Sequence, residues 1–291
     1  MLLLLTVEKL HKCLEICVLE NFQIFDRYKI GNHNNMNYQN IVPEDSISLF
    51  VKNIWVFENE DKNIHTTLPF FADGCPGLMF QQTDHGLIVK PHDKKMPEVF
   101  LYGQTILPIE LEISGAFLII VFQLYPYVLK TFFDIQPQSI NDNCYYFDDT
   151  EEDISWLKKQ LELSESVKDK IEIISKLLFR YFEKKKENLD FEIRQGIEYI
   201  FQTKGQESIR SIAGKLKFNI RTFERRFLTE TGLTAKQFAK IIQFQASLDQ
   251  LTVKDYEKHT DIVYQNGFSD QSHFIKVFKA FTGKTPKSFE K

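Results

Sequence analysis

The spacing of apolar residues divides the chain into two regions, the first with the pattern of strands and the second with the pattern of helices. Between about Ile41 and Tyr125, short β-branched and aromatic runs alternate with Gly, Pro and Asp clusters. Such runs predict the strands of a small sandwich or barrel. We expect strands at Ile54–Phe57, Leu78–Gln81, Leu87–Val89, Val99–Tyr102 and Phe117–Phe122.

Helical spacing follows Pro126 and continues to the end of the chain. Apolar residues three and four apart predict helices over Tyr127–Phe133, Ile154–Leu163 and Ser166–Phe182. From Asp190 onward every segment carries the signals of a short helix, with polar capping residues at the starts and Gly205 and Gly232 at two of the ends. The expected starts are Ser208, Asn219, Thr234, Thr260, Ser269 and Thr285.

These patterns predict an α+β protein with two domains. Residues 1–35 are expected to be an N-terminal tail or extension, and Met36 an alternative start. Residues 36–125 would form a small cupin-like β-barrel or sandwich. Residues 126–188 would form a helical connector, and residues 189–291 an all-α domain.

The all-α region contains an internal repeat. Ile212 and Phe218 recur fifty residues later as Ile262 and Phe268. After one inserted residue the offset becomes fifty-one. At that offset Phe223, Phe227, Thr231, Gly232, Thr234, Lys236 and Phe238 recur as Phe274, Phe278, Thr282, Gly283, Thr285, Lys287 and Phe289. Each copy has a short helix, a tight turn and a second helix, which is the order of a helix-turn-helix motif, and a long helix joins the copies.

Two such motifs in one chain predict binding of double-stranded DNA in two adjacent major grooves, which lie about 34 Å apart. Base edges would be read from the start of each second helix, because these residues enter the groove. The predicted base readers are Arg221, Glu224, Arg225, Gln271, Ser272 and Lys276. The predicted backbone contacts are Asn219, Thr222 and His273. The repeated phenylalanines are expected in the core.

The stretch from Asp261 to Phe274, followed by Phe278-Lys279 and Gly283-Lys284-Thr285-Pro286, resembles the signature of the AraC/XylS family of transcription regulators. Residues 212–234 resemble the family's first motif, and parts of 36–81 resemble the uncharacterised β-rich sensor domain of some members. The resemblance implies a sequence-specific regulator controlled by a small effector or by dimerisation, with RNA polymerase as a further partner.

Two positions depart from the family's pattern. Lys217 stands where the first motif usually has Gly, so it must take a positive φ or the turn must differ. Gln243 stands in the linking helix where an Arg is common, so a structural ion pair is expected to be missing.

The net charge differs in sign between the two parts of the chain. Residues 190–291 contain 17 Lys and Arg against 12 Asp and Glu, a formal charge of +5, whereas residues 1–189 contain 19 against 28, or −9. A basic C-terminal third suits a partner such as DNA. The longest apolar run, Ala116–Phe122, is too short to span a membrane, so a cytoplasmic protein is expected. Cys13, Cys17, Cys75 and Cys144 are read as thiols in a reducing compartment.

Two alternatives remain open. The first is a protein-binding module with a decayed DNA-binding domain. The second is an enzyme on the N-terminal part, which would need clustered metal ligands or an activated cysteine, and His65, His85 and His92 are scattered. We therefore expect no enzymatic activity, no catalytic residue, no metal and no cofactor, and the sequence leaves any effector site unknown.

Overall fold

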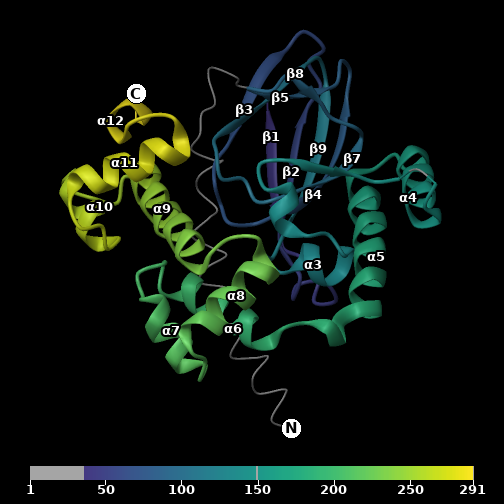
Figure 1. Ribbon diagram of the computed structural model, residues 1–291. Helices are drawn as coiled ribbons and strands as arrows, with labels where there is room; N and C mark the ends of the chain where they lie inside the picture. The colour runs from purple at the N-terminus through teal and green to yellow at the C-terminus, as the bar shows by residue number, and fades with distance from the viewer. Residues whose placement is uncertain (1–35, 149, 291) are drawn as a thin grey trace.

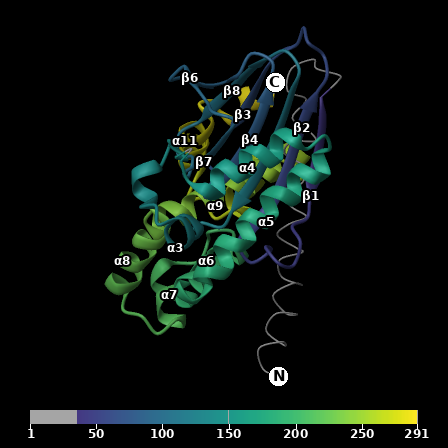
Figure 2. The same ribbon diagram turned by 90° about the vertical axis from the view of Figure 1, so that its right-hand side faces the viewer.

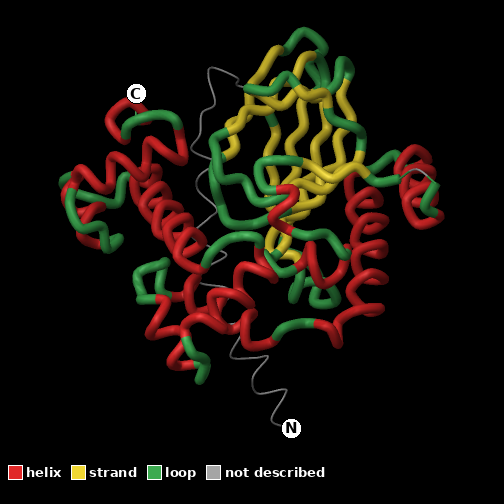
Figure 3. Tube along the Cα trace, in the orientation of Figure 1, coloured by secondary structure: helices red, strands yellow, loops and turns green. Residues whose placement is uncertain are grey.

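The computed structural model describes residues 36–290 apart from residue 149. Figures 1 and 3 show a β-rich part followed by a helical part. This confirms the predicted α+β class with a β-rich N-terminal region and a helical C-terminal domain. The expected tail, residues 1–35, lies outside the described residues, as do Cys13 and Cys17. The expectation that Met36 is an alternative start concerns the same residues.

Two antiparallel sheets form the β-rich part. The strands of the larger sheet, in spatial order, are β1 (Asn37–Ile41), β2 (Val51–Asn59), β9 (Phe117–Leu124), β4 (Gly77–Thr83), β7 (Val99–Tyr102) and β10 (Cys144–Tyr146). Those of the smaller sheet are β3 (His65–Phe70), β8 (Ile109–Ser114), β5 (Leu87–Lys90) and β6 (Lys94–Lys95). All five predicted strand segments lie within these elements.

The larger sheet is buried on both faces, which explains its nearly continuous apolar runs. Alternate residues point to opposite faces of a strand. In β2, Trp55 and Phe57 therefore join a core between the two sheets, while Ile54 and Val56 join a core beneath the helices. The described strands thus form a sandwich, and neither sheet closes into a barrel. The cupin-like barrel was one of two forms expected, and the structure has the other.

Helices cover the outer face of the larger sheet (Figure 2). They are α3 (Val128–Phe133), α4 (Glu152–Leu163) and α5 (Val167–Lys185). The 3-10 turn η1 (Pro137–Ile140) follows α3, and the turn η2 (Lys186–Asn188) follows α5. Phe132 of α3 and Phe182 of α5 pack with Phe50, with ring centroids 4.3–4.8 Å apart. Segment 126–188, expected as a connector, thus packs on the sheet and adds strand β10 to it.

The C-terminal helices are α6 (Phe191–Gln202), α7 (Ile209–Lys215), α8 (Ile220–Thr231), α9 (Ala235–Val253), α10 (His259–Gln265), α11 (Gln271–Thr282) and α12 (Pro286–Phe289). In Figure 1, α9 runs between the group α6–α8 and the group α10–α12. Caps predicted at Ser208, Asn219, Thr234 and Thr285 are all present.

Two predicted helix starts are wrong by one or two residues. Helix α10 begins at His259, before Thr260. Helix α11 is capped by Asp270 rather than Ser269, because the Asp270 carboxylate accepts the backbone N–H of His273 at 2.8 Å. The Ser269 hydroxyl instead donates to Asp270. Two adjacent capping residues compete here, and the carboxylate takes the N–H groups of the first turn.

Candidate nucleic-acid interface

The first helix-turn-helix motif, residues 209–231, is built from α7 and α8. Its turn closes when the N–H of Phe218 donates to the carbonyl of Ala213 at 2.9 Å. Asn219 then caps α8 by accepting the N–H of Thr222 at 2.9 Å. Lys217 has φ 59°, so the lysine takes a left-handed conformation, which is the first of the two possibilities that the sequence left open.

The second motif, residues 259–282, reproduces this geometry. The N–H of Phe268 donates to Val263 at 2.9 Å, and Gly267, the counterpart of Lys217, has φ 72°. The repeated threonines match as well. Thr231 and Thr282 each donate a hydroxyl to the carbonyl four residues back at 2.8 Å, and each is followed by a glycine with positive φ. The sequence repeat is therefore a repeat of structure at the level of single hydrogen bonds.

The strained lysine leads to a stability prediction. A residue with a Cβ loses about 1–2 kcal/mol in the left-handed region, which glycine avoids, although glycine also gives the unfolded chain more freedom. We expect Lys217→Gly to raise the free energy of unfolding by about 1 kcal/mol, measured by urea titration. The reciprocal change Gly267→Ala should lower it. No gain from Lys217→Gly would mean that the lysine side chain stabilises the turn by contacts that offset its strain.

The predicted base readers are all exposed. Arg221, Glu224 and Arg225 lie on α8, and Gln271, Ser272 and Lys276 lie on α11. The repeated phenylalanines of the same helices are buried, as expected: Phe223 and Phe227 in α8, Phe274 and Phe278 in α11. Each second helix thus has an apolar face in the core and a polar face open to a partner. Contact of these six side chains with DNA stays a prediction.

The three residues predicted to touch the DNA backbone have local roles. Asn219 is the exposed cap of α8, and Thr222 is half-buried one turn into that helix. His273 is half-buried, with its Nδ1 3.3 Å from the Ser269 hydroxyl and its ring against Phe268. The hydrogen bond from the His273 backbone lowers the pKa of Asp270, so this cap stays charged. A role in DNA contact for these three also stays a prediction.

Arg226, which the sequence did not single out, holds α8 against α6. Its guanidinium donates to both carboxylate oxygens of Asp190, at 2.9 and 2.6 Å, and lies over the Phe218 ring at 4.7 Å. Asp190 also caps α6. The hydrogen bond to Asp190 raises the pKa of Arg226. This pair joins residues 36 positions apart, and no local pattern could have indicated it.

The N-terminal part holds the end of α8 opposite to its base readers. The side-chain amides of Gln104, Gln138 and Asn141 donate to the carbonyls of Thr231, Leu228 and Gly232, at 2.6, 2.9 and 2.9 Å. Lys130 of α3 makes an ion pair with Glu230, which is 8% exposed. These contacts satisfy carbonyls that a helix end leaves open. The N-terminal part thus contacts the end of α8 through three hydrogen bonds and an ion pair.

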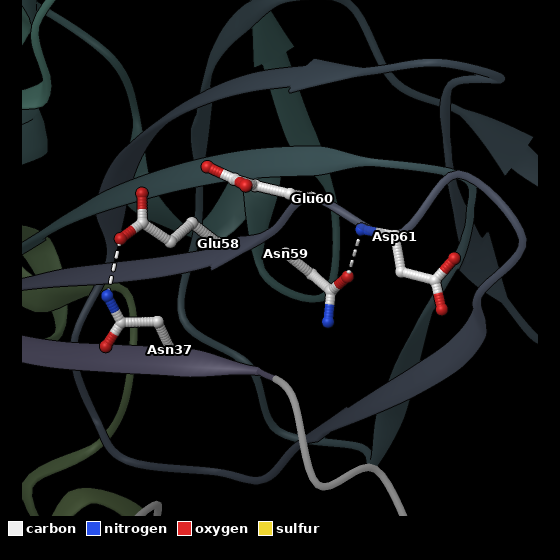
Figure 4. Close-up of a pocket in the computed structure, with 5 residues that line it drawn as sticks. All are labelled: Asn37, Glu58, Asn59, Glu60 and Asp61. Atoms are coloured by element: carbon white, nitrogen blue, oxygen red, sulfur yellow. Dashed lines mark hydrogen bonds between the residues drawn. The ribbon is translucent and has the colours of Figure 1, made fainter.

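A small pocket lies at the edge between β1 and β2 (Figure 4). It is lined by Asn37, Glu58, Asn59, Glu60 and Asp61. Asn37 donates to Glu58 at 2.5 Å, and the N–H of Asp61 donates to Asn59 at 2.7 Å, so two pairs of its polar groups are hydrogen-bonded to each other. In the described part of the chain, no group of three or more His, Cys, Asp or Glu side chains could hold a metal ion.

The two described cysteines are free thiols in shielded positions. Burial raises the pKa of Cys75 to about 12 and that of Cys144 to about 11. Such thiols stay protonated at neutral pH, whereas a nucleophilic cysteine needs a lowered pKa. No described helix has both the length and the apolar character to cross a membrane.

Both parts of the chain are similar to known domain families. Residues 212–291 match a family described as a helix-turn-helix domain, and residues 39–145 match a domain of unknown function (DUF6597). The HTH-type transcriptional activator RhaS of Citrobacter koseri is 35% identical over 69 residues. This match spans 24% of the present chain and 24% of the relative.

Solved structures of ToxT from Vibrio cholerae are also similar. The structure from O395 is 15% identical and covers 87% of this chain and 96% of its own, with a TM-score of 0.42. The structure of ToxT with bound unsaturated fatty acid, from strain SCE256, is 14% identical and covers 89% and 96%, with a TM-score of 0.43.

Proposed function

We propose that this chain, whose C-terminal third is a helix-turn-helix domain of the AraC type behind an N-terminal domain of unknown function, is a sequence-specific DNA-binding transcription regulator. The observation that carries the proposal is the pairing of two structurally equivalent motifs with an exposed polar face on each second helix. In this class of motif that helix enters the major groove and its first residues meet the bases.

The side chains on the two faces suit this task. Arg221 and Arg225 are about one helical turn apart on the exposed face of α8, so their side chains are neighbours on the helix surface. Arginine is the usual bidentate partner of guanine, and Gln271 offers the amide that pairs with adenine. Lys276 carries the charge that suits a phosphate or a guanine.

Control of the protein is part of the proposal. The N-terminal domain would bind a small effector or a second copy of the chain, and the amide contacts to Leu228, Thr231 and Gly232 would pass the change to α8. RNA polymerase would be the downstream partner. We place the protein in the cytoplasm, where DNA is accessible.

The test is Arg225→Ala in the full chain, on a duplex obtained by selection from random sequences with the unaltered protein. We expect a loss of about 1–3 kcal/mol, or about 5- to 150-fold in affinity, and relaxed preference at one base pair. The affinity of the unaltered protein should also fall steeply with salt, because phosphate contacts release counterions.

The matched control is Lys168→Ala, which removes one exposed positive charge from α5 in the other part of the molecule. It should leave affinity and base preference unchanged. The proposal fails if the selection enriches no sequence, or if Arg225→Ala binds the selected duplex as tightly as Lys168→Ala does.

A further inference from the structure

The turn of the second motif contains a buried amide where the first motif has a hydrocarbon. Asn266, which is 4% exposed, occupies the position fifty residues after Leu216. Its Nδ2 donates to the Gln250 side chain at 2.7 Å and to the carbonyl of Ile262 at 2.9 Å. Burying an amide is unfavourable unless it is hydrogen-bonded. The two hydrogen bonds of Asn266 therefore fix the orientation of its side chain, which packing alone would not do.

Four glutamines surround this turn and come from three elements: helix α9, helix α10 and the loop before α7. Gln243 of α9 donates to the carbonyl of Asn266 at 2.8 Å, and Gln250 of α9 donates to the side chain of Gln265. Gln206, in the loop before α7, donates to the carbonyl of Gln265 at 2.9 Å. We call these residues the amide cluster: Gln206, Gln243, Gln250, Gln265 and Asn266.

The amide cluster links the second motif to α9 and to the loop that leads into the first motif. Gln206 leads into the first motif, and the neighbouring Gly205 lies so close to α9 that a Cβ there would be 2.1 Å from the carbonyl of Ala239. Gln206 also packs over Gly267, where a Cβ would be 3.2 Å from its Cγ. The loop before the first motif, the linking helix and the turn of the second motif thus meet at one point, while Figure 1 places α8 and α11 toward opposite ends of α9.

Hydrogen bonds restrict geometry in a way that apolar contacts do not. Each amide requires its partner in a narrow range of distance and angle, whereas leucines at the same place would tolerate rotation of one motif about α9. Buried polar residues that select one register among several are known in helix packing. Gln243 contributes to this cluster through its hydrogen bond to the carbonyl of Asn266.

We propose that the amide cluster is a positioning device that sets the separation and rotation between the two reading helices, and so the half-site spacing that the protein accepts. This inference rests on the proposed function. One added base pair moves a half-site by about 3.4 Å and turns it by about a tenth of a helical turn. A rigid pair of motifs must lose contacts on such a duplex, and a loosened pair can follow it.

The experiment compares three duplexes at one salt concentration: the duplex selected by the full-length protein, and the same duplex with one base pair added or removed between the half-sites. The variants are Asn266→Leu, which installs the residue of the first motif, and Gln206→Ala, whose side chain is exposed and whose loss leaves the core intact. Gln202→Ala, an exposed amide of α6 outside the cluster, is the control.

We expect the unaltered protein and Gln202→Ala to bind the selected spacing about tenfold or more tightly than the altered spacings. For Asn266→Leu and Gln206→Ala this ratio should fall to about threefold or less. If both variants keep the ratio of the unaltered protein, including the case in which affinity falls equally on all three duplexes, the amide cluster has no positioning role. If no duplex is enriched in the first place, the proposed function fails instead.

Discussion

Gly205→Ala is expected to lower the free energy of unfolding by about 3–5 kcal/mol. Gly205 has φ 71°, a conformation that side chains with a Cβ rarely adopt. A Cβ at this position would be 2.1 Å from the carbonyl oxygen of Ala239 and 2.9 Å from the backbone nitrogen of Gln243. Both atoms belong to the backbone of α9 and cannot rotate away, so the loop would have to leave the helix. Urea unfolding followed by circular dichroism measures the loss.

Gly214→Ala is the matched control. Gly214 lies within α7, and a Cβ there would meet no atom within 4 Å. Alanine favours the helix over glycine by about 1 kcal/mol, so this variant should be slightly more stable than the unaltered protein. A loss below about 1 kcal/mol for Gly205→Ala would contradict the close approach of the loop to α9.

Phe238→Ala is expected to lower the free energy of unfolding by a similar amount, about 3–5 kcal/mol. The ring is fully buried and packs on Phe201 of α6 at 5.5 Å and on Phe227 of α8 at 5.6 Å. It also lies against Gly74 of the N-terminal part, where a Cβ would be 2.7 Å from the ring. The cavity left by alanine would therefore open between the two parts of the chain as well as within the first motif.

Two further variants distinguish the effect of the size of the cavity from the effect of its location. Phe238→Leu keeps most of the volume and should cost about 1–2 kcal/mol. Phe244→Ala removes a fully buried ring of the same helix that packs on Phe278 and Phe281 of α11. Both alanine variants should unfold at lower urea concentrations than the unaltered protein. Limited proteolysis should distinguish them, with faster cleavage near residues 186–190 in Phe238→Ala than in Phe244→Ala. Equal cleavage rates would indicate that Phe238 does not join the two parts.

Local patterns predicted the helical domain well. The caps at Asn219 and Thr234, and the stop at Gly232, depend on hydrogen bonds between residues a few positions apart, so the sequence alone shows them. The β-rich part was harder. Strands β1, β3, β6, β8 and β10 were not predicted, because several are short or polar and gain their order from a neighbour in the sheet. The choice between barrel and sandwich depends on sheet closure, which no short segment encodes.

In the candidate site, too, local patterns predicted some features and only the folded structure shows the others. The periodicity of apolar residues placed Arg221, Arg225, Gln271 and Lys276 on the exposed faces of α8 and α11, because a helix with a buried phenylalanine stripe must turn its other residues outward. The sequence by itself thus determined the duplicated motif and the side chains that it presents. Only the tertiary structure decided what holds the motifs: the amides that Gln104 and Asn141 extend to the end of α8, and the amide cluster around Asn266. Those contacts join residues between 16 and 127 positions apart in the chain, and their strength depends on direction and burial, which exist only after the chain has folded.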